Sequence, residues 1–103
     1  MTERRRARRH EIEILFNKHV RGQPHLCRLT ELSASGLSSV RLGGPDTGPG
    51  SFTVELRLPG DGPVIWAWAR TVWQRGRREA ARFVALRPDD ARRIQRYLAV
   101  HAA

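Results

Sequence analysis

The sequence has 103 residues, with 19 basic and 10 acidic side chains that give a formal net charge of +9. This length suits one domain with a modest core. A single cysteine, Cys27, excludes an intrachain disulfide and is expected to be buried between its apolar neighbours. No apolar run approaches the roughly 18 residues of a membrane-spanning helix. The basic N-terminus is not followed by the apolar segment of a secretory signal, so we expect a cytoplasmic protein.

The first nine residues form a strongly basic segment. Its charge of +4 comes from one acid and five arginines: Glu3, Arg4, Arg5, Arg6, Arg8 and Arg9. Like charges repel, and the segment offers little apolar surface to bury. Residues 1–9 are therefore predicted to be a flexible basic arm, and residues 10–103 a single domain. The excess positive charge predicts an anionic partner, with phosphates, nucleic acid and anionic lipid all open.

Most of the remaining chain alternates between apolar and polar residues, as half-buried strands do. The alternation, broken by turns rich in Gly and Pro, predicts strands near 12–16, 25–32, 37–42, 51–58, 64–74 and 81–86. Short strands joined by tight turns are typical of an antiparallel sandwich or barrel. Trp66 and Trp68 are expected on one strand face and Trp73 on the other. They serve either as packed residues or as a patch for a partner.

The last segment changes to a helical period. Asp89 or Asp90 is suited to the start of a helix, because a carboxylate there caps free N–H groups. Ala91, Ile94 and Leu98 then lie three and four residues apart on one apolar stripe. A helix this short is marginal alone. The pattern predicts a C-terminal helix at about 89–101 that docks on the barrel, over one open end.

The sequence gives little support for catalysis or for metal binding. Its four histidines and one cysteine lack the ligand spacing of zinc sites, and no glycine-rich phosphate loop is present. Ser33 and Ser35 have only His25 as a nearby base, and it lies eight residues before Ser33 in the sequence. We therefore predict no enzyme, no metal site and no cofactor.

Two features remain, and together they suit a guanine nucleotide. The first is a set of arginines spaced four apart before the first strand, and the second is the segment that holds Glu31, Ser33 and Gly36. Arginine engages the N7 and O6 acceptors of guanine with two parallel bonds. A carboxylate accepts the N1–H and N2–H₂ donors, and phosphates take guanidinium and hydroxyl groups. Glycine would let the chain turn and approach the ligand.

These motifs resemble the signature of the PilZ family of cyclic di-GMP receptors. That signature is Arg-x-x-x-Arg before the first strand, then Asp/Asn-x-Ser-x-x-Gly after the second. The first motif fits in two registers, and the preferred one places its second arginine closer to the strand. The resemblance assigns ligand binding to Arg5, Arg9, Glu31, Ser33 and Gly36, with Arg4 and Arg8 as the alternative arm register.

The resemblance extends over nearly the whole chain. Segments 56–60, 69–73 and 81–86 are similar to later strands of the family. It implies a six-stranded antiparallel β-barrel with a flexible arginine-rich N-terminal arm and a C-terminal helix. It also implies a regulatory module of bacterial second-messenger signalling, which binds cyclic di-GMP and acts through an unidentified protein effector.

One residue departs from the family pattern. Position 31 is Glu, where the family has Asp or Asn. A degenerate adaptor that no longer binds the dinucleotide and works by protein contacts is therefore the alternative interpretation. A nucleic-acid-binding barrel is the third, because the charge suits phosphates and the tryptophans suit base stacking. The sequence leaves open whether the protein is a monomer or a dimer.

Overall fold

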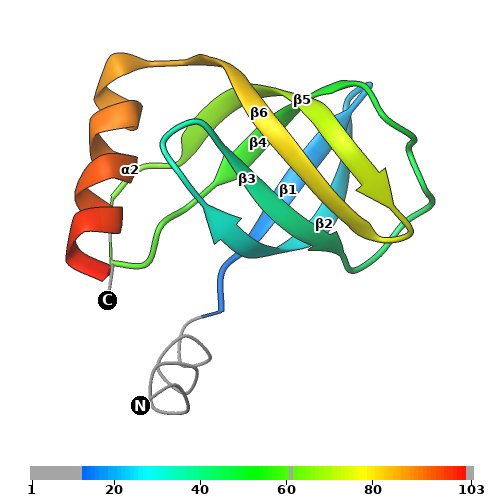
Figure 1. Cartoon of the computed structure of the whole chain (residues 1–103), viewed down its shortest axis with the longest axis horizontal. Helices are drawn as coiled ribbons and strands as arrows, with labels where there is room; N and C mark the ends of the chain where they lie inside the picture. Colours follow the sequence, from blue (N-terminus) through cyan, green and yellow to red (C-terminus); the bar gives the residue numbers. More distant parts are fainter. Residues whose placement is uncertain (1–12, 61, 102–103) are drawn as a thin grey trace.

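The computed structural model describes residues 13–60 and 62–101. Its strands are β1 (Leu15–Val20), β2 (Gln23–Leu32), β3 (Gly36–Arg41), β4 (Ser51–Leu56), β5 (Ile65–Arg75) and β6 (Arg78–Leu86), followed by the helix α2 (Pro88–His101). The strands are all antiparallel and close into a barrel in the order β1-β2-β3-β6-β5-β4 (Figure 1). The predicted six-stranded antiparallel β-barrel with a C-terminal helix is confirmed. The predicted arm, residues 1–9, lies outside the described residues.

The core fills the inside of the barrel. On β4 the inward residues Phe52, Val54 and Leu56 are almost fully buried. Alternation sends every second side chain of a strand to the same face, so these three point together into the interior. On β5 the inward positions include Ala67 and Ala69, which are small enough for a narrow barrel. Burying each of the larger apolar side chains contributes about 1.5–3 kcal/mol.

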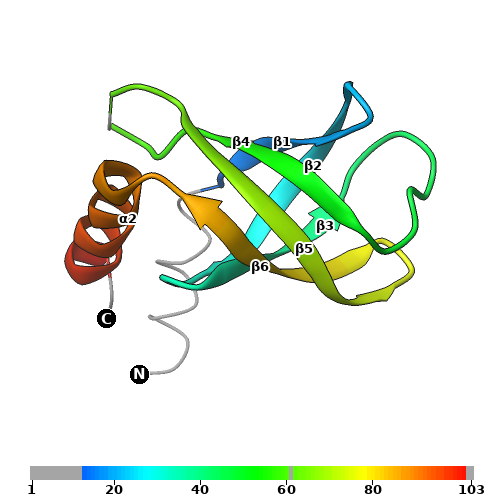
Figure 2. The same ribbon diagram turned by 90° about the horizontal axis from the view of Figure 1, so that it is seen from above.

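The helix α2 covers one end of the barrel (Figures 1 and 2). Pro88 opens the helix, where its missing N–H has no helical partner to lose. Asp90 is buried in the first turn and accepts a hydrogen bond from Arg93 Nη1 at 3.0 Å. Ile94 is fully buried and joins the barrel core, with Tyr97 partly buried beside it. The prediction that the helix docks on the barrel is confirmed.

Two predicted strands have the wrong bounds. The first strand was expected at 12–16, yet β1 begins at Leu15 and ends at Val20. The last was expected from residue 81, yet β6 begins at Arg78. In both cases a charged side chain faces the interior: Lys18 and Glu79 are buried and form an ion pair at 2.6 Å. Charged residues at inward positions hide the alternation that pattern analysis depends on.

The prediction that Trp73 faces away from the other two tryptophans is wrong. The register between β5 and β6 shifts at Val72, which adds one residue to β5. A bulge of this kind reverses the facing of every residue that follows it. Trp73 therefore pairs with Ala80 and points outward, like Trp66 and Trp68. All three rings are about half exposed on the outer surface.

Candidate functional site

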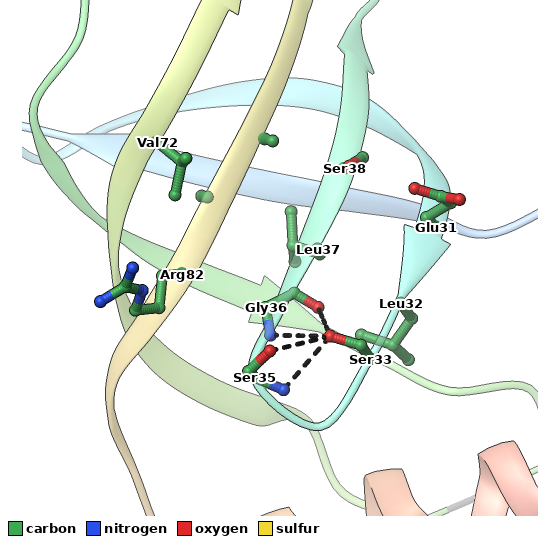
Figure 3. Close-up of a pocket in the computed structure, with 11 residues that line it drawn as sticks. Glu31, Leu32, Ser33, Ser35, Gly36, Leu37, Ser38, Val72 and Arg82 are labelled. Atoms are coloured by element: carbon green, nitrogen blue, oxygen red, sulfur yellow. Dashed lines mark hydrogen bonds between the residues drawn. The ribbon is translucent and has the colours of Figure 1, made fainter.

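A tight turn built around Ser33 joins β2 to β3. The backbone N–H of Ser33 donates to the carbonyl of Gly36 at 2.9 Å. The Ser33 hydroxyl accepts the backbone N–H groups of Ser35 and Gly36, both at 3.2 Å (Figure 3). Serine hydroxyls commonly close turns in this way. Ser33 thus fixes the shape of the turn.

Gly36 has a packing role that the sequence did not indicate. The φ angle of Gly36 is not positive, so the backbone angles of the turn do not require glycine at this position. A Cβ at position 36 would lie 2.1 Å from the carbonyl oxygen of Ala81 and 3.0 Å from the Cα of Arg82. Only a residue without a side chain lets β3 pack this closely on β6. The expectation that this glycine serves to turn the chain is therefore corrected.

An open groove runs across the outer face of the barrel beside this turn. It encloses about 400 Å³, which is within the range of small-molecule sites. Its floor is made of small residues, since Gly36, Ser38 and Ala80 line it from neighbouring strands. Figure 3 shows Glu31 at one margin and Arg82 at the other, with β3 between them. The motif residues Glu31, Ser33 and Gly36 thus come together at one groove.

The two margins carry opposite charges. Glu31 is exposed and forms no ion pair with any described residue. Arg82 is also exposed, and its partner in the β-sheet register is another arginine, Arg70. The groove therefore offers a hydrogen-bond acceptor, Glu31, on one side and a cationic donor, Arg82, on the other. This arrangement suits a ligand that combines a donor edge with an anionic group.

The chain enters the barrel beside the strand that leads into the serine turn. The carbonyl of Ile14 accepts the N–H of Leu29 at 2.8 Å, and β1 then pairs along β2. The first described residues, Glu13 and Ile14, therefore lie near the end of β2. The arm residues assigned by resemblance lie outside the described residues: Arg5 and Arg9, with the alternative register Arg4 and Arg8.

The half of the groove that β5 and β6 contribute was not predicted from the sequence. Val72, Ala80, Ala81 and Arg82 line it, yet none of them belongs to a motif. Ser38 carried a weak signal, because it lies two residues after Gly36 and so shares its strand face. The residues of β6 carried none, since they reach the groove only through the pairing of β3 with β6.

The thiol of Cys27 lies in an environment that disfavours reaction. Cys27 is buried, as expected, and its Sγ lies 3.6 Å from the carbonyl oxygen of His25. Burial raises the pKa of this thiol, which disfavours the reactive thiolate. Among residues 13–60 and 62–101, no group of three or more His, Cys, Asp or Glu could hold a metal ion. No helix in this part of the chain is long and apolar enough to cross a membrane.

A second exposed surface surrounds Trp66 and Trp68 on β5. The ring of His19 lies 5.7 Å from that of Trp66, centroid to centroid. Its Nε2 forms a hydrogen bond with Glu55 Oε1 at 2.7 Å. This bond lowers the pKa of the Glu55 carboxyl below its usual value. None of these residues lines the groove, so this aromatic surface, Trp66 and Trp68 with His19 and Glu55, is a separate feature.

A small closed barrel with an open, charged groove on its outer face has the form of a ligand-binding module. The family model of the PilZ domain matches residues 3–100, which is nearly the whole chain. The chain therefore belongs to the PilZ domain family. PilZ domains are binding and regulatory modules, and the assignment supports a role in cyclic di-GMP signalling in general. No curated protein matches the chain in a sequence comparison.

Proposed function

We propose that this chain is a receptor for cyclic di-GMP that binds the dinucleotide in the groove beside the serine turn. Arg5 and Arg9 would complete the site from the N-terminal side, and the occupied surface would act on a protein effector in the cytoplasm. The observation that carries the proposal is the meeting of Glu31, Ser33 and Gly36 at one groove in a chain of the PilZ family.

The chemistry of the groove supports this ligand. A flat purine needs a floor without large side chains, and Gly36, Ser38 and Ala80 provide one. The Glu31 carboxylate is free to accept the N1–H and N2–H₂ donors of guanine. Adenine lacks both of these donors, so a carboxylate at this margin favours guanine.

Only a short length of chain separates the arm arginines from the first described residue, Glu13. Glu13 lies four positions after Arg9, so the chain between their Cα atoms spans at most about 14 Å when fully extended. An arginine side chain adds further reach from that point. Because the first described residues lie beside the end of β2, the proposal places Arg9 and then Arg5 over a ligand held at the serine turn.

Calorimetric titration with cyclic di-GMP at moderate salt tests this proposal. The wild-type protein is expected to show saturable binding in the micromolar range or tighter. Arg9→Ala removes a charge-assisted contact, and we expect it to weaken binding about 10-fold or more. Arg96→Ala is the matched control, because it removes the same charge from an exposed position on α2. Absence of heat at high ligand concentration would overturn the proposal.

A degenerate adaptor is the second candidate function, favoured by Glu31 and by the exposed aromatic surface. A glutamate is one methylene longer than the family's aspartate, and a displaced charged hydrogen bond costs about 1.5–3 kcal/mol. That loss corresponds to roughly 10- to 150-fold in affinity.

The variant Glu31→Asp separates the two candidates. For a receptor, we expect wild-type protein to bind and Glu31→Asp to bind the same or more tightly. For an adaptor, only Glu31→Asp would bind, and the wild-type protein would give no heat. Glu31→Ala is the control, because it removes the acceptor and should bind more weakly than either carboxylate. Equal affinity of Glu31→Ala and wild type would remove position 31 from the site.

A further inference from the structure

Arg82 and Arg70 lie side by side on the outer surface of the barrel. They are register partners on β6 and β5, and both are exposed. No carboxylate of the described residues forms an ion pair with either of them. Like charges that lie directly opposite on adjacent strands destabilise a sheet. The fold thus maintains two neighbouring arginines that have no carboxylate partner among the described residues, and one of them, Arg82, lines the groove.

Arg82 is held rigidly beside the serine turn. Its Cα pairs with that of Gly36, whose missing side chain allows β3 and β6 to approach closely. The next residue, Phe83, donates its N–H to the carbonyl of Ser35 at 2.8 Å. A cationic group on paired strands loses little backbone freedom when it binds an anion, whereas a residue on an unpaired segment loses more.

We propose that Arg82, with Arg70 beside it, anchors a phosphodiester group of the bound dinucleotide from the barrel side of the groove. This inference rests on the proposed receptor function and adds to it a contact that lies outside the two sequence motifs. The anchor belongs to the folded barrel, and so it acts independently of the N-terminal arginines.

The geometry of a nucleotide supports this assignment. The sugar of guanosine is attached to the imidazole ring, away from the N1 and N2 edge. A guanine that gives this edge to Glu31 therefore directs its sugar and phosphate toward the opposite margin. Arg82 stands at that margin (Figure 3). Guanidinium groups bind phosphate oxygens with parallel, charge-assisted hydrogen bonds.

The anchor has a second consequence, which concerns stability. Replacing Arg82 with a neutral residue removes its repulsion from Arg70 in the free protein. Arg82→Gln is therefore expected to raise the melting temperature by about 1–5 °C while it weakens ligand binding. A residue that merely stabilised the barrel would lower the melting temperature and affect binding only through folding.

The experiment measures cyclic di-GMP affinity by calorimetry and melting temperature by circular dichroism for full-length variants. Arg82→Gln is expected to bind about 5- to 20-fold more weakly than wild type. Arg82→Lys keeps the charge but loses the parallel hydrogen bonds, so it should recover only part of this loss. Arg57→Gln, an exposed arginine of the barrel that does not line the groove, is the matched control and should bind like wild type.

The outcomes separate this inference from the proposed function. Wild-type binding that is lost in Arg9→Ala but unchanged within twofold in Arg82→Gln would overturn the anchor alone. Equal weakening in Arg57→Gln would also overturn it, since the effect would then be one of general charge. Absence of binding by wild-type protein would overturn the proposed function and, with it, the anchor.

Discussion

Gly36→Ala is expected to lower the free energy of unfolding by about 1–3 kcal/mol, the range for overpacking a close contact. The added Cβ would lie 2.1 Å from the carbonyl oxygen of Ala81, so the backbones of β3 and β6 must separate. The pairing of β3 with β6 also positions the serine turn and Arg82. Chemical denaturation followed by circular dichroism measures the loss, and ligand affinity should fall with it.

Gly43→Ala is the matched control for this substitution. A Cβ at position 43 meets nothing within 4 Å, and its φ is not positive. We expect its stability to remain within about 0.5 kcal/mol of wild type, as for most surface changes. Equal stabilities of Gly36→Ala and Gly43→Ala would contradict the packing role of Gly36. The role of this glycine would then be to let a ligand approach the backbone.

Lys18→Met is expected to destabilise the protein by about 3–5 kcal/mol, because it leaves a buried carboxylate without its cation. Lys18 Nζ lies 2.6 Å from Glu79 Oε1 and 4.5 Å from the ring centroid of Phe52. The Thr71 hydroxyl donates to Glu79 Oε2 at 2.5 Å, and this is the only other side-chain hydrogen bond of that carboxylate among the described residues. Urea or guanidinium unfolding measures the change.

The double variant Lys18→Met/Glu79→Met tests whether the lost stability comes from the unpaired charge. Replacing both partners of a buried ion pair with apolar residues is often close to neutral. The double variant should therefore be more stable than Lys18→Met alone. Arg92→Ala is the control, because it breaks an exposed ion pair with Asp89 and should cost less than about 1 kcal/mol. Additive losses in the double variant would contradict this explanation.

The sequence predicted the strands whose two faces differ clearly in polarity. β4 alternates between apolar residues such as Val54 and polar residues such as Thr53, and its location was correctly predicted. The ends of β1 and β6 were missed because Lys18 and Glu79 occupy inward positions, where each one neutralises the other. Such a pair is visible only once the partner strand is known.

Only the groove residues that belong to the β2–β3 segment could be predicted from the sequence, for a similar reason. Glu31, Ser33 and Gly36 are close in sequence and form a motif, so their grouping followed from one segment of chain. Arg82 and Ala80 reach the same groove through the register of β3 with β6, which no local pattern records. The outward facing of Trp73 was missed because it depends on a one-residue bulge.

Occupation of the groove beside the serine turn by a guanine dinucleotide is tested most directly by an NMR titration. Isotope-labelled protein is titrated with cyclic di-GMP, with backbone amides and tryptophan indoles assigned. We expect saturable shifts at Glu31, Ser33, Ser38 and Arg82, which line the groove, and little change at the indole of Trp66. Shifts confined to the aromatic surface, or no shifts at all, would contradict the claim.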